Sequence, residues 1–140
     1  MRRVFIDTGG FVALLIAEDR MHERAATLFE SASREHWSLV TTNVVVVVET
    51  YSVLLARARD GRRVAVAFLD AVQTAAPTLT VERVRIEDEI AAMNLVRTHV
   101  DKAYSLCDAL SFVVMERLAV AHAIAFDRHF REYGRFTILM

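Results

Sequence analysis

The chain has 140 residues, of which 54% are hydrophobic and 25% charged, and this composition excludes a disordered chain and suits one globular domain over residues 1–140. No apolar run in the sequence is long enough to cross a membrane, and Asp7 interrupts the N-terminal apolar segment too early for a signal peptide. The net charge of −1 argues against a general nucleic-acid binder, and the single cysteine, Cys107, excludes an intrachain disulfide, so we expect a protein of the reducing cytoplasm.

Short apolar segments alternate with helical patterns in the first half of the chain. The run 4–6 predicts a buried strand that ends at Asp7, and the spacing of apolar residues predicts helices over 11–17 and 22–33. Residues 38–42 read as a strand, after which Asn43 is placed to cap a helix. The next segment is ambiguous, because five consecutive valines favour a strand whereas 49–57 favours a helix.

The same alternation continues in the second half. The patterns there predict helices and strands in turn: a helix over 61–74, a strand over 78–84, helices over 87–98 and 105–118, a buried strand over 121–126 that is closed by Asp127, and a last strand over 136–139. Strands that alternate with helices indicate an α/β fold with a mainly parallel central sheet flanked by helices.

Four acidic residues stand in positions that suggest chemistry. Asp7 and Asp127 directly follow two predicted strands, and the ligand crevice of an open parallel sheet lies beyond the carboxyl ends of its strands. Glu49 and Asp108 stand among apolar neighbours, where a charge is costly unless it is paired or binds a metal. Each acid also has a structural explanation: Asp7 and Asp127 as turn or cap residues, Asp108 in a capping box with Ser105, and Glu49 on a solvent-facing stripe.

Taken together, the four acids indicate a divalent cation. Carboxylates that lie close together repel one another unless a cation neutralises them. Oxygen ligands favour Mg²⁺ or Mn²⁺, and the histidines lack the spacing of a zinc site. Of these histidines only His129 is a candidate, because it follows Asp127 closely enough for its imidazole, or the guanidinium of Arg128, to reach a phosphate.

Arginine supplies sixteen of the seventeen basic residues, and four of them lie within seven positions: Arg57, Arg59, Arg62 and Arg63. A guanidinium pairs with phosphate in a bidentate manner, so the cluster is either a phosphate-contacting patch or the solvated end of a helix. The sequence leaves both interpretations open.

The sequence resembles the PIN-domain family, and within it the VapC-like toxin ribonucleases. Four segments in the family's order carry the resemblance: Phe5-Ile6-Asp7-Thr8, Thr41-Thr42-Asn43 with Val48-Glu49-Thr50, Asp101-Lys102 with Ser105-Leu106-Cys107-Asp108-Ala109, and Phe126-Asp127-Arg128-His129-Phe130. The resemblance implies that Glu49 lies on a helix and that the four acids converge on one or two Mg²⁺ or Mn²⁺ ions. It further implies an RNA substrate cut to leave a 5′ phosphate, a homodimer, and an antitoxin partner whose arginine-bearing tail occupies the acidic pocket.

Under this interpretation Asp7, Glu49 and Asp108 hold a metal that activates water, Asp127 completes the metal shell or positions the water, and Thr8 orients a carboxylate or touches phosphate. The chain departs from the family at Cys107 and Ala125, where the family often has hydroxyl residues that donate hydrogen bonds to a carboxylate.

Three alternatives remain. Asp7-Thr8-Gly9 matches the catalytic triplet of aspartic proteases, but those proteins are nearly all β. A PIN-like module could bind RNA or protein without cutting, and an RNA-processing nuclease could act outside a toxin-antitoxin pair.

Overall fold

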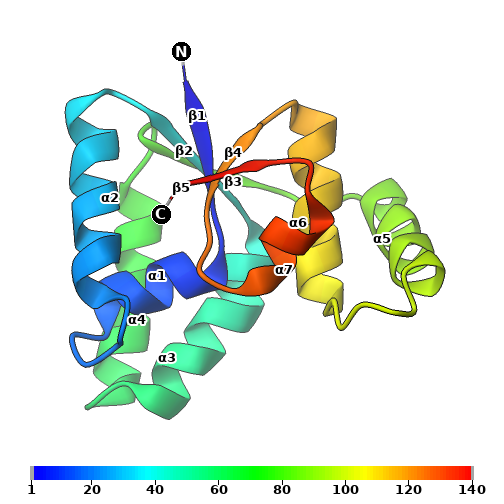
Figure 1. Ribbon diagram of the computed structural model, residues 1–140. Helices are drawn as coiled ribbons and strands as arrows, with labels where there is room; N and C mark the ends of the chain where they lie inside the picture. Colours follow the sequence, from blue (N-terminus) through cyan, green and yellow to red (C-terminus); the bar gives the residue numbers. More distant parts are fainter. Residues whose placement is uncertain (1, 140) are drawn as a thin grey trace.

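The computed structural model describes residues 2–139. Its five strands are β1 (Arg3–Ile6), β2 (Ser38–Thr42), β3 (Leu79–Glu82), β4 (His122–Ile124) and β5 (Thr137–Leu139). All neighbouring strands are parallel, in the order β3-β2-β1-β4-β5. The helices are α1 (Thr8–Leu15), α2 (His22–Arg34), η1 (Val44–Thr50), α3 (Tyr51–Arg57), α4 (Gly61–Thr74), α5 (Ile86–Thr98), α6 (Leu106–Leu118) and α7 (Arg128–Tyr133). The predicted α/β fold with a parallel sheet is confirmed (Figure 1).

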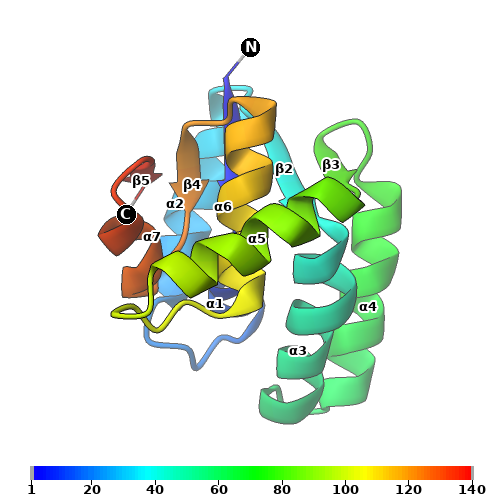
Figure 2. The ribbon, with the colours of Figure 1, turned by 90° about the vertical axis from the view of Figure 1, so that its right-hand side faces the viewer.

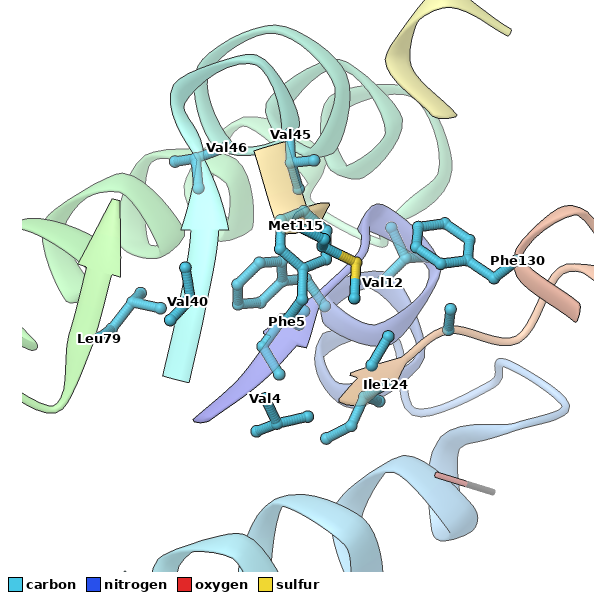
Figure 3. Packing of buried hydrophobic residues seen from close by; sticks show 14 of the residues in the cluster. Val4, Phe5, Val12, Val40, Val45, Val46, Leu79, Met115, Ile124 and Phe130 are labelled. Carbon is cyan, nitrogen blue, oxygen red and sulfur yellow. The ribbon is translucent and has the colours of Figure 1, made fainter. Parts of the chain in front are cut away.

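The central strand, β1, is buried on both faces. Val4, Phe5 and Ile6 are all fully buried, as expected for a parallel strand covered by helices on both sides. Val4 points toward α2, whereas Phe5 points to the opposite face, where Met115 of α6 packs (Figure 3). Because side chains alternate along a strand, this one apolar run supplies the core of both layers.

Helices cover the two faces of the sheet. Helix α2 lies on one face and α6 on the other, with α5 packed outside α6 (Figures 1 and 2). Arg117 on α6 fixes this outer layer, since it donates two hydrogen bonds to the buried Asp88 carboxylate, at 2.8 and 2.9 Å, and one to Glu82 at 2.9 Å. These bonds hold the pKa of Asp88 below its usual range. Among residues 2–139, no helix has the length and apolar character needed to cross a membrane.

The valine run 44–48 is helical. The family resemblance implied a helix here, whereas β-propensity favoured a strand. Val44–Thr50 forms a π-helix, η1, which buries Val45 and Val46 against the core. Burial of two valines on one side therefore outweighs their preference for strands. Asn43 is the N-cap residue of η1, as predicted, but its side chain makes no capping hydrogen bond: it accepts from Val84 N at 2.8 Å, and the Thr42 hydroxyl accepts from Val45 N at 3.1 Å instead.

Several element bounds differ from the prediction. The strand 38–42 and the helix 61–74 were predicted correctly. Strands β3 and β4 are shorter than the predicted strands 78–84 and 121–126. β4 ends at Ile124 because the chain then turns into α7, a six-residue helix that was not predicted. Helix α1 begins at Thr8, three residues before the predicted start.

Candidate active site

Asp7 lies where β1 ends and α1 begins. Its backbone N–H donates to Ile124 O of β4 at 3.1 Å, which ties the end of β1 to the neighbouring strand. Gly10 lets α1 approach this point, since a Cβ there would lie 3.1 Å from the Ile124 carbonyl oxygen. The Asp7 side chain is 3% exposed, and its Oδ1 has no hydrogen-bond partner among residues 2–139. Burial, followed by the negative charges of Asp127 and Asp108, raises the pKa of Asp7 well above its usual range.

Asp108 lies in the first turn of α6 and forms a capping box with Ser105. The Ser105 hydroxyl accepts from Asp108 N at 3.0 Å, and Asp108 Oδ2 accepts from Ser105 N at 3.1 Å. The structural explanation of this acid is therefore correct, yet the same side chain also has an oxygen within 4.8 Å of one on Asp127, and its charge raises the pKa of Asp7. Burial raises the pKa of Asp108, and the hydrogen bond from Ser105 only partly offsets this.

Asp127 caps α7, the helix whose His129 contacts Asp108. Its Oδ1 accepts from His129 N at 2.8 Å. The imidazole of His129 then reaches back, and its Nδ1 lies 2.8 Å from Asp108 Oδ2. An ionised carboxylate can only accept, so with Asp108 ionised this bond requires the hydrogen of the imidazole to be on Nδ1. Asp108, Asp127 and His129 each offer a ligand atom, and these atoms lie within 4.8 Å of one another.

Glu49 lies on η1 and is the fourth acid of the set Asp7, Glu49, Asp108 and Asp127, called here the acidic group. It is half-buried, and its charge contributes to the raised pKa of Asp7. The four acids thus come from the end of β1, from η1, and from the N-terminal ends of α6 and α7. An oxygen-rich cluster with a buried, unpartnered carboxylate oxygen fits a hard divalent cation, which would neutralise the repulsion.

The PIN-domain model matches residues 4–136. This chain belongs to the PIN-domain family. It is 34% identical over 131 residues to VapC20 of Mycobacterium tuberculosis, a 23S rRNA-specific endonuclease, and the match covers 94% of each chain. The crystal structure of VapC20, described as a Sarcin-Ricin loop cleaving toxin, superposes with a TM-score of 0.83 at 32% identity, over 94% of this chain and 95% of that one.

Two more distant solved structures share the PIN fold. VapBC2 from Rickettsia felis, bound to a DNA fragment from its promoter, gives a TM-score of 0.69 at 10% identity and covers 98% of this chain and 97% of its own. FitAcB from Neisseria gonorrhoeae gives 0.64 at 13% identity and covers 98% and 96%. At such identities the likeness concerns the fold alone.

Cys107 stands at a position where the PIN-domain family often has a hydroxyl residue. Burial first, and then the negative charges of Glu49 and Asp7, raise the pKa of its thiol, which is therefore neutral. A neutral thiol can donate a hydrogen bond, as the hydroxyl that it replaces does. Ala125 is fully buried and offers no side-chain donor.

The other predicted residues of this PIN domain divide into two groups. Ser105 and His129 both donate to Asp108, so the structure brings them into the acidic group. Thr8 lies beside Asp7 with its hydroxyl buried and unpartnered among residues 2–139. Arg128, in contrast, is mostly exposed and pairs with Glu132 at 3.2 Å on its own helix, so no contact joins it to the acids.

Two buried hydroxyls escaped the sequence analysis. Thr50 and Ser111 are fully buried, and their oxygens have no partner among the described residues. Thr50 follows Glu49, and Ser111 lies three positions after Asp108, which places it on the same side of α6. That helical spacing is the signal that could have drawn attention to Ser111.

Packed aromatic rings fix the position of His129 and of the helices α6 and α7, which carry Asp108 and Asp127 at their N-terminal ends. The His129 ring packs edge-on against Tyr104, with centroids 5.7 Å apart, and Phe112 stacks on Tyr133 at 4.3 Å. Phe112 also contacts Phe130 at 4.8 Å, which joins α6 to α7. Because Asp108 and Asp127 begin these two helices, the packing fixes the separation of the two carboxylates.

Proposed function

We propose that this chain is a divalent-metal-dependent endoribonuclease that serves as the toxin of a toxin-antitoxin pair, and that residues 1–140 form its single PIN-like domain. One observation carries the proposal: Asp7 is buried where β1 ends, at the carboxyl edge of a parallel sheet, with one carboxylate oxygen unpartnered among residues 2–139 and with the charges of three further acids raising its pKa. The ligand crevice of such folds lies at this edge. The match to VapC20 over 94% of both chains supports RNA as the substrate.

In this proposal Asp7, Glu49, Asp108 and Asp127 hold Mg²⁺ or Mn²⁺ and are the catalytic residues. When bound, such an ion lowers the pKa of water and stabilises charge on the phosphodiester. Asp7 and Asp108 are the more buried acids and supply fixed negative oxygens. The side chain of Asp127 is 46% exposed and so lies nearest to incoming RNA.

His129 is a positioning residue in this scheme. It occupies Asp108 Oδ2 with a hydrogen bond of 2.8 Å, which leaves Oδ1 as the oxygen that can turn toward a cation. Ser105 N donates to the same Oδ2, so two donors fix the orientation of the carboxylate. Partners of this kind orient ligating carboxylates and tune metal affinity.

RNA cleavage by the purified chain tests the proposal. The substrates are a hairpin with the sarcin–ricin loop sequence, chosen because VapC20 is described as cleaving that loop, and a scrambled hairpin of equal length. We expect cleavage with Mg²⁺ or Mn²⁺, none with EDTA, and a loss of at least about 100-fold in Asp7→Asn. Asp70→Asn is the matched control, because Asp70 is an exposed aspartate on α4 outside the acidic group.

Cleavage that persists at full rate in Asp7→Asn would contradict the site. Absence of cleavage of any RNA by the metal-loaded wild type would favour the alternative of a binding module that does not cut. A gene for a small antitoxin beside this one would support the toxin assignment, and its absence would favour an RNA-processing nuclease. The homodimer implied by the family resemblance stays a prediction, which light scattering of the purified chain measures.

A further inference from the structure

A groove adjoins the acidic group and is not used by it. Its volume is about 400 Å³, and its lining includes Asp127 of the acidic group and Thr8, which follows Asp7 in the sequence. From there it runs between the α1–α2 loop, which contributes Arg20, and α3, which contributes Arg57. The groove therefore adjoins the acids at which cleavage is proposed.

The lining of the groove combines positive charge with apolar surface. Arg20 and Arg57 are both exposed, and the side chain of Arg57 is 56% exposed. Val12, Val53 and the half-buried Phe126 supply the apolar part. Single-stranded nucleic acid is bound by this combination, in which cationic groups follow the backbone and apolar or aromatic groups contact sugars and bases.

Arg57 already holds an anion in this groove. Its Nη2 lies 3.4 Å from Asp19 Oδ2, a long ion pair that is open to water on the arginine side. Asp19 is fixed independently, because its Oδ1 accepts a hydrogen bond from Met21 N at 2.8 Å. The Asp19 carboxylate thus stands where an anionic oxygen would meet the guanidinium. Exposed ion pairs are weak, and a phosphate, with more acceptor oxygens, can replace the carboxylate.

We propose that this groove binds the RNA backbone next to the cleaved bond, with Arg57 contacting a flanking phosphate and Asp19 competing with that phosphate for Arg57. The inference rests on the proposed ribonuclease function, since it takes the acidic group as the place of cleavage. It assigns one arginine of the cluster predicted from the sequence to substrate binding and makes Asp19 a residue that weakens RNA affinity.

The test compares three variants for RNA binding in EDTA, where no cleavage takes place. Arg57→Gln removes the phosphate contact. Asp19→Asn removes the competing charge, while its amide oxygen can still accept from Met21 N and keep the loop in shape. Arg62→Gln is the matched control, an exposed arginine on α4 that lines a different surface hollow. The probe is a fluorescent single-stranded RNA, titrated at several salt concentrations.

The two groove variants should shift RNA affinity in opposite directions. We expect Arg57→Gln to raise the dissociation constant about fivefold and to reduce the slope of log affinity against log salt by about 0.7, the value for one phosphate contact on a single strand. Asp19→Asn should lower the dissociation constant about two- to threefold, and Arg62→Gln should change it less than twofold. A purely structural ion pair would instead make both groove variants weaker or leave both unchanged.

Three outcomes would overturn the inference. Arg57→Gln and Arg62→Gln could weaken binding equally, which would indicate a general charge effect. Asp19→Asn could weaken RNA binding. Alternatively, RNA affinity could stay constant in all variants while Asp19→Asn weakens binding of an arginine-bearing peptide, which would assign the groove to a protein tail. Because the assay contains no metal, RNA binding with the expected pattern but no cleavage by the metal-loaded protein would refute the proposed function and leave the groove as an RNA-binding site.

Discussion

Replacing Asp7 by asparagine measures the cost of burying this carboxylate without a cation. Asp7 is 3% exposed and one of its oxygens has no partner among residues 2–139. Asparagine has nearly the same shape, carries no charge, and can donate to the neighbouring acids. We therefore expect metal-free Asp7→Asn to be more stable than metal-free wild type by about 1–3 kcal/mol, the range for a buried unsatisfied polar group. For a chain of this length, the melting temperature would rise by roughly 3–10 °C.

Added metal should reverse this order. Mn²⁺ at about 100 times its dissociation constant stabilises a binding protein by about 2.7 kcal/mol, and the variant lacks a ligand and should gain much less. Differential scanning fluorimetry in EDTA and in Mn²⁺ measures both effects, with Asp70→Asn as the control that should alter neither. If Asp7→Asn melts below the wild type in EDTA, the carboxylate stabilises the empty fold and the reasoning is refuted.

The pH dependence of the metal-free protein follows from the same burial. The pKa values of Asp7 and Asp108 are raised in the folded state, so the folded chain retains protons that the unfolded chain releases. Stability therefore falls as pH rises from the ordinary carboxyl pKa of about 4 through the raised values. Urea unfolding in EDTA should show greater stability at pH 5 than at pH 7, and Asp7→Asn should reduce that difference. A wild type that is more stable at pH 7 would contradict it.

Three further substitutions test separate contacts. His129→Ala should weaken Mn²⁺ binding at least about tenfold by calorimetry, because a partner that orients a ligand is lost, whereas the exposed His36→Ala should not. Arg117→Ala should lower the free energy of unfolding in urea by about 3 kcal/mol, since it leaves a buried carboxylate unpaired; a loss below about 1 kcal/mol would contradict the buried pair. Cys107 should react slowly with iodoacetamide at pH 7, and Glu49→Gln should speed the reaction by lowering the pKa of the thiol; equal rates would show that the two side chains do not interact.

The elements that were predicted correctly have sharp boundaries in the sequence. β2 coincides with the predicted 38–42, and α4 coincides with 61–74, because each pattern stops at residues that favour a turn or cap. Asp7 was also placed correctly at the end of β1, whereas Asp127 lies three residues beyond the end of β4, as the cap of α7. Hydrophobic periodicity and turn-forming residues predict local structure well. In a parallel sheet, a residue that directly follows a strand must also lie at the carboxyl edge of the sheet.

What the sequence could not supply depends on tertiary contacts. Five valines favour a strand, and only their packing against the core makes η1 helical, so resemblance to a family succeeded where propensity failed. The bond from His129 to Asp108 joins residues 21 positions apart, and no spacing rule indicates it. The pair of Arg57 with Asp19 likewise connects α3 to a loop 38 positions earlier. The sequence alone therefore left Arg57 open as either a phosphate contact or a charged helix end, until the fold placed it in a groove.

The central claim is that four acids and a divalent ion hydrolyse RNA with water as the nucleophile. Analysis of the cleavage products in water enriched in ¹⁸O tests this most directly. A nucleophile taken from water predicts products with a 3′ hydroxyl and a 5′ phosphate that carries one ¹⁸O atom. Products that end in a 2′,3′-cyclic phosphate with an unlabelled 5′ hydroxyl would contradict the claim, because the RNA's own 2′ hydroxyl would then be the nucleophile.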